Sequence, residues 1–453
     1  MSFPAYPEYK DSGVEWLGEV PTHWEVKRLS HYFKERREKA SDAEFAPLSV
    51  TMHGVVPRLE NAAKTKDGDN RKKVLPGDFV INSRSDRKGS SGISPTSGTV
   101  SLICIVLEPQ CVVRRFVHHL LRSVPFQEEF YKHGKGIVAD LWSTGFADMK
   151  NIMLAMPPSE EQQAIANFLD HETARIDALI EEQQRLIELL KEKRQAVISH
   201  AVTKGLDPDV PMKDSGVEWL GEVPEHWDVA KFKYAIAEFE QGWSPQCDSK
   251  PVNSAAEWGV LKVGCVNQGA FDPTENKRLP DSLEARPDLA VRKDDLLISR
   301  ANTRELVGSA AQVPEDHPNL MASDKLFVLR LAQGVCNTRY AAAYLGDRRV
   351  RHQIELEATG ASSSMLNIGQ AAIRELWMPL PPKEEQDRII EDLDNKNTVF
   401  TTLERETALN IQLLNERRSA LISAAVTGKI DVRGWTPPAS STEAEHEGEG
   451  AVT

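Results

Sequence analysis

The sequence lacks every short motif that would indicate nucleotide, cofactor or metal chemistry. Its 453 residues contain no GxxxxGK[ST] phosphate loop and no glycine-rich strand-to-helix fingerprint for dinucleotides. The Asn-Pro-Pro-aromatic signature of adenine methylation is absent as well, and so are His/Cys pairs at metal-ligand spacing. A chain of this length without a catalytic constellation is more typical of recognition than of chemistry. We therefore expect no catalytic residue and no metal site.

Cysteine and long apolar runs are also scarce. The five cysteines are an odd number at unrelated spacings, which argues against a disulfide framework and a zinc site. No apolar run approaches the roughly 18 residues of a membrane helix, and residues 1–10 lack the basic start and apolar segment of a signal peptide. We expect a cytoplasmic protein of two to three domains, with reduced thiols and no membrane span.

What the sequence does contain is a long internal repeat. Residues 157–207 match residues 381–431 at 22 of 51 positions, with a constant offset of 224 and no insertion or deletion. One inserted residue would rotate the rest of a helix by roughly 100°. A gap-free repeat therefore predicts one continuous helix of roughly 40 residues per copy. Ser159 is expected to cap the first helix and Gly205 to end it, while Gly428 ends the second.

An apolar series with a seven-residue period runs along both copies. Gln183 and Thr407 interrupt this series. The period predicts that the helices pair as a coiled coil. The alternative is two amphipathic helices that lie on separate domain cores. The expected packing residues are Leu169, Ile176, Leu190 and Val197 in the first copy and Leu393, Phe400, Leu414 and Leu421 in the second, with Leu179, Leu186 and Leu403 widening the stripe.

A second, shorter repeat precedes each variable region. Residues 10–29 and 213–232 are identical at 15 of 20 positions, and each copy holds two tryptophans with a Gly and a Pro between them. His23 and His226 have no partner at metal-ligand spacing, so we interpret the segment as an aromatic anchor on a neighbouring surface and not as a site. The chain thus consists of anchor, variable region and helix, twice over. Residues 202–205 and 426–429 lie beyond the heptads, and we expect them to tolerate insertions.

The first variable region is locally basic in an acidic chain. Residues 46–125 carry twelve Lys/Arg against six Asp/Glu, whereas the whole chain has a net charge of −13. Such a segment could contact a polyanion, although a merely solvated basic surface is the alternative. We expect strands at 78–82 and 100–107, a helix at 115–131 and a Gly/Ser-rich loop at 88–98. The candidate DNA contacts are Arg58, Lys64, Lys66, Arg71, Lys72, Lys73, Arg84, Arg87, Lys88 and Lys135.

The second variable region repeats this plan with little identity. Residues 291–308 resemble residues 74–92, since each has a turn, an Asp, a short apolar strand, then Ser, Arg and a polar loop. A second polar loop, near residues 362–367, could approach phosphates or base edges. Residues 436–453 are rich in Pro, Ser, Glu and Gly and should be disordered. The candidates here are Lys262, Arg300, Asn302, Arg304, Ser362, Ser363, Ser364 and Asn367.

Taken together, the paired Trp-Leu-Gly…Pro-x-His-Trp anchors, PP-x-EEQ helix starts and GD-x-x-I-x-S-R-like strand resemble the specificity subunit of type I restriction-modification systems. The resemblance extends from about residue 10 to residue 435. It implies an α+β chain in which two mixed α/β target-recognition domains are separated by two long antiparallel helices that form a coiled coil with a pseudo-two-fold repeat. The implied segments are 1–156, 157–207, 208–380 and 381–431, followed by the tail 436–453.

The same resemblance implies partners and the cofactors of those partners. Each domain would read one half of a bipartite site in double-stranded DNA, and the helices would set the gap and dock two methylation subunits and further restriction subunits. The chain itself would bind no cofactor. S-adenosylmethionine would belong to the methylation subunit, and ATP and Mg to the restriction subunit. Because the two variable regions differ, the site should be asymmetric.

Two other functions remain open from the sequence. One is a DNA-binding regulator or decoy that acts without methylation partners. The other is a structural coiled-coil protein whose variable regions bind something other than DNA. Salt-dependent binding to duplex DNA and co-purification with a methyltransferase separate these possibilities.

Overall fold

The computed structural model describes residues 3–59, 68–136, 142–254, 256–362 and 365–437. The chain forms two compact units, each of which contains part of both long helices. Unit 1 combines residues 1–184 with residues 408–453, and unit 2 consists of residues 185–407. The boundary between the two units cuts each long helix near its middle. No helix among the described residues is long and apolar enough to cross a membrane.

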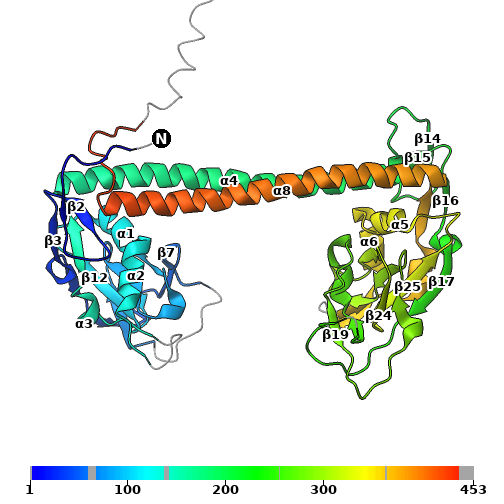
Figure 1. The fold of residues 1–453 in the computed structure, drawn as a ribbon, viewed down its shortest axis with the longest axis horizontal. Helices are drawn as coiled ribbons and strands as arrows, with labels where there is room; N and C mark the ends of the chain where they lie inside the picture. The colour runs from blue at the N-terminus through cyan, green and yellow to red at the C-terminus, as the bar shows by residue number, and fades with distance from the viewer. Residues whose placement is uncertain (1–2, 60–67, 137–141, 255, 363–364, 438–453) are drawn as a thin grey trace, which may run out of the picture. The chain divides into compact units, whose positions relative to one another are not determined.

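Unit 1 is built around a four-stranded antiparallel sheet. Its order is β10 (Ser91–Ile93), β9 (Phe79–Asn82), β12 (Cys104–Pro109) and β4 (Phe33–Glu35). The helices α1 (Arg114–Arg122) and α2 (Val124–Lys132) lie beside this sheet (Figure 1) and share its apolar core. Smaller sheets surround it: β11 (Gly98–Val100), β8 (Arg71–Val74) and β5 (Lys39–Ala40); β6 (Leu48–Thr51) and β7 (Gly54–Pro57); β13 (Met153–Met156) and β3 (Glu25–Arg28); β1 (Tyr9–Asp11) and β2 (Glu19–Pro21).

Several expected elements of unit 1 are divided in the structure. The strand expected at 78–82 is confirmed as β9, but the one expected at 100–107 is split between β11 and β12. The helix expected at 115–131 is two helices, because the chain is extended at Ser123, whose side chain accepts a hydrogen bond from the Phe126 N–H at the start of α2. The expected loop at 88–98 contains β10. Short α3 (Phe146–Met149) precedes β13.

Unit 2 repeats the central sheet in the same order. Strands β23 (Ala310–Gln312), β21 (Leu296–Ser299), β25 (Leu326–Leu331) and β17 (Ile236–Gln241) correspond to β10, β9, β12 and β4. This confirms the likeness between residues 74–92 and 291–308. The other elements are β19 (Asn276–Arg278), β18 (Gly259–Leu261), β24 (His317–Ala322) and β20 (Ala290–Val291); β22 (Ala301–Asn302), β27 (Met365–Asn367) and β26 (Thr359–Ser362); β16 (Asp228–Lys231) and β28 (Trp377–Leu380); β14 (Met212–Asp214) and β15 (Glu222–Pro224); and α5 (Thr338–Leu345), α6 (Arg348–Glu357) and α7 (Gln370–Glu375).

The two expected long helices are continuous and somewhat longer than predicted. They are α4 (Ser159–Lys204) and α8 (Lys383–Val426), with 46 and 44 residues. Ser159 is the first helical residue and not the residue before it, so its expected role as a cap is not observed. Gly205 follows α4 with a φ of +78° and Gly428 ends the turn after α8 with a φ of +73°, conformations that favour glycine.

The expected tolerance of residues 202–205 to insertions does not fit the structure. The side chains of Val202 and Thr203 are buried, and Thr203 Oγ1 accepts a hydrogen bond of 3.0 Å from Arg349. A Cβ atom added to Gly205 would lie 3.2 Å from the Trp227 ring. The end of α4 is thus packed into the core of unit 2, although it lies beyond the heptads.

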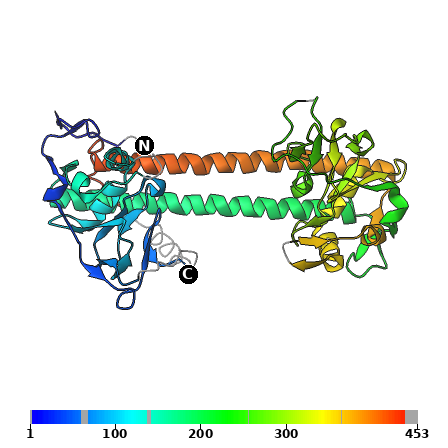
Figure 2. The ribbon, with the colours of Figure 1, turned by 90° about the horizontal axis from the view of Figure 1, so that it is seen from below.

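Within each unit the two helices lie side by side and antiparallel (Figure 2). The buried and half-buried positions alternate at spacings of three and four residues, as a heptad seam requires. Leu169 and Ile176 from the start of α4 share one core with Leu421 and Ala425 from the end of α8. The seam comprises Thr173, Ile176, Ile180, Gln183, Ile187, Leu190, Arg194, Val197 and Ala201 in α4, and Phe400, Glu404, Thr407, Ile411, Leu414, Arg418, Leu421 and Ala425 in α8.

Leu169 and Leu393 precede the first seam residues of α4 and α8, and they pack against the cores of units 1 and 2. Three other expected packing residues do not belong to the seam. Leu179, Leu186 and Leu403 have exposed fractions of 38%, 41% and 40%. Each of them precedes a seam residue by one position, so that its side chain is rotated about 100° out of the seam. Thr407, which interrupts the apolar series, is buried in the seam. Its hydroxyl donates a 2.7 Å hydrogen bond to the Leu403 carbonyl of its own helix, so this polar group has a partner there.

Two arginines at repeat-equivalent seam positions form ion pairs across it. In unit 2, Arg194 Nη2 lies 3.1 Å from Glu404 Oε2 and donates to Thr401 Oγ1 at 3.2 Å. In unit 1, Arg418 Nε lies 3.0 Å from Asp177 Oδ1. Arg418 is Arg194 plus the offset of 224, and Thr401 is Asp177 plus the same offset. The pairs therefore repeat the pseudo-two-fold symmetry of the sequence at the level of single contacts.

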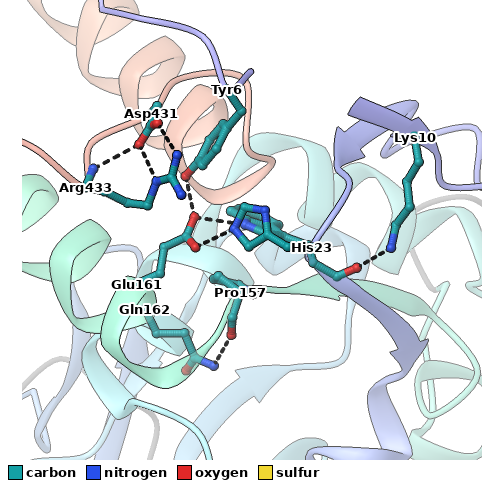
Figure 3. Close-up of polar contacts among 9 residues, drawn as sticks. Tyr6, Lys10, His23, Pro157, Glu161, Gln162, Asp431 and Arg433 are labelled. Atoms are coloured by element: carbon teal, nitrogen blue, oxygen red, sulfur yellow. Dashed lines mark hydrogen bonds and ion pairs between the residues drawn. The ribbon is translucent and has the colours of Figure 1, made fainter. Parts of the chain in front are cut away.

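The first anchor packs on the first turn of α4 through a buried carboxylate (Figure 3). Trp24 is fully buried and its indole N–H donates to Glu161 Oε1 at 2.9 Å. His23 Nε2 lies 2.7 Å from Glu161 Oε2, and the Tyr6 hydroxyl donates to Oε1 at 2.5 Å. In the second copy His226 Nε2 lies 2.7 Å from Glu385 Oε2. The predicted structural role of the anchor is confirmed, and the two histidines bind the helix starts.

The glutamine that follows each of these glutamates ties the variable region to the helix. Gln162 Oε1 accepts from the Val113 N–H at 2.8 Å, just before α1, and Gln386 Oε1 accepts from the Asn337 N–H at 2.7 Å, just before α5. Arg115, the second residue of α1, pairs with Asp170 of α4 at 2.7 Å. The equivalent Arg339 and Asp394 pair in unit 2. The repeated PP-x-EEQ motif is therefore a joint between anchor, variable region and helix.

The seam predicts that alanine substitutions at two adjacent residues, a leucine and an isoleucine, lower the free energy of unfolding by different amounts. We expect Ile180→Ala to destabilise unit 1 by about 1–2 kcal/mol, because it removes half-buried apolar surface between the helices. Leu179→Ala, the matched control at the adjacent exposed position, should cost less than about 0.5 kcal/mol. Urea unfolding followed by circular dichroism measures both values. Equal costs would contradict the assignment of the seam.

A half-buried histidine, His118, predicts acid sensitivity of unit 1. Burial, with Arg122, His119 and Arg418 nearby, lowers the pKa of His118 to about 3 against the opposing effect of Asp170, and His118 Nε2 accepts a hydrogen bond from Arg122 at 2.9 Å. The unfolded chain takes up this proton below about pH 6.5, whereas the folded chain does so only near pH 3. Stability is therefore lost as the pH falls through 6.5, by about 2 kcal/mol at pH 5.

Melting temperatures at pH 7.5 and pH 5 test this origin of the acid sensitivity. His118→Gln keeps an acceptor for Arg122 but does not titrate, so it should lose less stability than the wild type on acidification. His53→Gln, at an exposed histidine, is the control and should behave as the wild type does. An unchanged acid loss in His118→Gln would contradict the assignment.

Candidate nucleic-acid interface

In unit 1 the polar loop after β9 is closed at its base and joined to a second segment. The Asn82 N–H donates to the Ser90 carbonyl at 2.9 Å, which closes the β9–β10 loop (residues 83–90). Ser83 and Ser143 share a hydroxyl hydrogen bond of 2.8 Å, and the Ser85 N–H donates to the Trp142 carbonyl at 2.9 Å. Two segments that are distant in the sequence therefore form one polar surface at the end of the central sheet.

Four candidate cations of unit 1 lie on or beside this surface and remain accessible. The side chains of Arg84, Arg87, Lys88 and Lys135 are 37%, 68%, 44% and 76% exposed. Their acidic neighbours are exposed or half-buried as well, for example Asp86 at 3.6 Å from Arg84 Nε and Asp148 at 2.6 Å from Lys135 Nζ. Exposed ion pairs of this kind are weak and are readily exchanged for contacts with a polyanion.

The basic triad on β8 is placed differently from the expectation. Arg71 is buried and its Nε lies 2.8 Å from Asp42 Oδ1. Lys72 Nζ donates to the Cys104 carbonyl at 2.7 Å, and Lys73 Nζ donates to Glu38 at 2.6 Å. These cations are bonded within the domain, so we leave them out of the interface. Sequence charge alone could not distinguish them from free cations.

Other candidates of unit 1 lie away from the loop or outside the described residues. Arg58 follows β7 and is half-buried. Lys64 and Lys66 lie outside the part of the chain that the structure describes. The same is true of Ser363, Ser364 and the side chain of Ser362 in unit 2, and of residues 438–453 in the expected disordered tail.

In unit 2 the corresponding loop joins a β-hairpin. The Ser299 N–H donates to the Ser309 carbonyl at 2.8 Å and closes the β21–β23 loop (residues 300–308). Ala301 of β22 pairs with Asn367 of β27, and the Ile368 N–H donates to the Arg300 carbonyl at 2.9 Å. The two polar segments expected from the sequence, near residues 300–308 and 362–367, are thus brought together by one small sheet.

The candidates of unit 2 surround this sheet. Arg300 is half-buried, with Nη1 3.2 Å from the Asp324 carbonyl, and Arg304 is exposed. Asn302 is half-buried beside Asn267, with 3.4 Å between the amide nitrogen and oxygen, and Asn367 lies on β27. Lys262 pairs with Glu275 at 3.0 Å. Guanidinium and amide groups placed in this way have the donors and acceptors that base edges require.

The sequence reasoning missed two side chains of these surfaces. Trp142 is 40% exposed next to Ser143, and an exposed indole can stack on a base or a sugar. Asn267 lies beside Asn302 although 35 residues separate them. A tryptophan within a polar loop was a usable signal for Trp142, whereas the position of Asn267 depends on the fold alone. Among the residues described, no group of three or more His, Cys, Asp or Glu is placed to hold a metal ion.

The chain is similar to several specificity subunits of type I restriction enzymes. It is 24% identical over 368 residues to the type I restriction enzyme EcoKI specificity subunit of Escherichia coli K12, covering 79% of this chain and 76% of that protein. It is 24% identical to the MjaVIII specificity subunit of Methanocaldococcus jannaschii, covering 91% and 94%. The match to the EcoEI subunit of Escherichia coli is 28% identical but spans 48% of this chain and 36% of the relative. No family model matches.

Solved structures share the fold. A chain from a study of complex assembly and conformational transition of the type I R-M system aligns with a TM-score of 0.65 at 16% identity, covering 90% of this chain and 98% of that one. The HsdS subunit of Thermoanaerobacter tengcongensis aligns with a TM-score of 0.51 at 18% identity, covering 91% and 98%. These likenesses confirm the α+β fold, with two β-rich domains and two long helices.

Proposed function

The chain belongs to the family of type I restriction enzyme specificity subunits, and we propose on that premise that it is the DNA-reading component of a type I restriction-modification complex. The observation that carries the proposal is the duplicated polar surface. Each unit places a closed loop after its central strand against a second polar segment, with the same strand order. The anchors are identical at 15 of 20 positions and the helix repeats align without a gap, while these surfaces differ, as expected if the scaffold is common and the targets are not.

Each recognition domain reads one half of a bipartite, asymmetric site in double-stranded DNA. We assign residues 1–156 and 208–380 to these domains. Arg84 and Arg87 of the first loop and Arg300, Asn302 and Arg304 of the second reach base edges, while the surrounding lysines contact phosphates. The half-sites lie about one helical turn apart, so that both face the protein. The chain acts on DNA in the cytoplasm.

The long helices carry the partners. Outside the seam, α4 and α8 expose leucine and valine side chains by 38% to 58%, more apolar surface than a solvated helix face needs. Methylation subunits dock on these faces, one for each half of the duplication, and restriction subunits add to that core. The exposed residues are Leu179, Leu186, Leu189, Val399, Leu403, Leu409 and Leu413. S-adenosylmethionine binds to the methylation subunit, ATP and Mg to the restriction subunit, and the chain itself is not catalytic.

Co-expression with the neighbouring reading frames tests the assignment. A tagged chain should co-purify with a methyltransferase, and the complex should methylate adenines at one bipartite sequence. Binding to duplex DNA should weaken steeply with salt, since phosphate contacts release counterions. Sequence-specific binding without any methyltransferase would favour a stand-alone regulator or decoy. Lack of salt-dependent DNA binding would exclude both functions.

Loss of one loop arginine should relax one half-site only. We expect Arg84→Ala to cost about 1–3 kcal/mol of discrimination at one position of the first half-site, and Arg300→Ala the same in the second. Lys135→Ala, which removes an exposed cation, should weaken all sequences alike. Binding to matched and singly substituted duplexes measures these effects. If both variants discriminated between matched and substituted duplexes as the wild type does, Arg84 and Arg300 would not be base-reading residues.

Helix length should set the gap between half-sites. Seven residues added to each helix, after Gln184 in α4 and after Thr407 in α8, preserve the heptads and lengthen each helix by about 10 Å. DNA advances about 3.4 Å per base pair, so the added length corresponds to about three pairs. Each added pair also turns the far half-site by roughly 35°, so we expect the gap to grow by at most about three pairs. Mapping of methylated adenines for the wild type and the variant in one host decides the question. An identical gap would mean that the helices only dock partners.

A further inference from the structure

In both units the loop after the central strand turns on a glycine that lies against the second helix of the domain. Gly89 has a φ of +83° and Gly308 a φ of +74°. A Cβ atom added to Gly89 would lie 3.3 Å from Gln127 Oε1 of α2, and one added to Gly308 would lie 3.1 Å from Arg351 Nη1 of α6. Arg351 is Gln127 plus the repeat offset of 224. The same helix position thus supports the same turn in both domains.

In unit 1, α2 holds the loop through a tyrosine. The Tyr131 hydroxyl lies 3.2 Å from the Asn82 carbonyl, where the loop begins, and 3.5 Å from the Arg87 carbonyl near its tip. Burial raises the pKa of Tyr131 to about 12, so this hydroxyl keeps its proton at neutral pH. Thr144, in the segment beside the loop, donates to the Phe130 carbonyl of α2 at 2.9 Å. Both polar segments of the surface are therefore bound to one helix.

In unit 2, α6 holds the loop through an arginine. Arg351 Nη2 donates to the Glu305 carbonyl at 3.2 Å, near the middle of the β21–β23 loop. Burial lowers the pKa of the Arg351 guanidinium. Ile354, one turn later on α6, lies 2.5 Å from a Cβ built on Gly308, so the glycine permits the loop to lie directly on the helix. A half-buried arginine that bonds a loop carbonyl fixes the backbone next to Arg304.

We propose that Tyr131 and Arg351 are positioning residues for base recognition, each acting on one half-site through the loop that it holds. This rests on the proposed function. Backbone hydrogen bonds close the base of each loop and form local turns at its tip, such as the 2.8 Å bond from the Val307 N–H to the Thr303 carbonyl. Tyr131 and Arg351 supply side-chain bonds that hold these turns on α2 and α6. Base readout requires placement within about 0.5 Å, so a looser tip lowers discrimination and leaves the arginines themselves in place.

Half-site discrimination of the full chain, purified with its methylation subunits, tests the proposal. A pool of random duplexes first gives the wild-type site, and duplexes with single substitutions in either half then serve as probes. Tyr131→Phe should lose roughly three- to tenfold of discrimination in one half, as expected for one hydrogen bond. Arg351→Met should do the same in the other half. The salt dependence of binding should stay as in the wild type, since a lost phosphate contact would lower its slope by about one.

A matched variant separates positioning from loss of stability. Tyr344→Phe removes a buried hydroxyl that donates to the Trp377 carbonyl at 2.8 Å, away from the loop. It should lower the melting temperature without changing discrimination in either half. Unchanged discrimination in Tyr131→Phe and Arg351→Met, or an equal change in both halves, would overturn the proposal. If the wild-type complex selects no sequence, the proposed function itself fails and the inference falls with it.

Discussion

The first turn of each long helix is the joint on which the remaining structure depends. Glu161 binds the anchor through His23 and Trp24, and Gln162 of the next position binds the backbone before α1. Buried polar groups are costly when they lack partners, so these contacts define how anchor, sheet domain and helix meet. Because Glu385 and Gln386 repeat the contacts to the histidine and to the backbone, the two units share this joint although their variable residues differ.

The heptad seam then joins the two helices within each unit. The seam is not entirely apolar. Arg194 and Arg418 occupy equivalent seam positions and pair with acidic residues of the other helix. Removing one partner of such a pair leaves a partly buried charge, so the pairs favour one alignment of the helices over others. The seam thus combines apolar burial for stability with polar contacts for register.

Much of this architecture was predictable because it depends on repetition. The gap-free repeat predicted α4 and α8, and the likeness of residues 74–92 and 291–308 predicted β9 and β21 as equivalent strands. The side of the helix that pairs was harder to predict. Leu179 and Ile180 are adjacent and equally apolar, and only the alternation of three and four residues places Ile180 in the seam. A period of seven alone does not make that choice.

The sequence predicted which loops form the candidate interface, but it did not predict which cationic side chains of the domain are exposed there. Charge selected Arg71 and Arg84 alike, but Arg71 points into the domain against Asp42, whereas Arg84 lies on a loop at the end of a strand. The difference arises from tertiary contacts that composition does not encode. Positions after the central strand are the better guide, because strand ends place polar loops on the surface while the strand fixes their base. Recognition residues can therefore diverge between the two units without disturbing the joint that holds each unit together.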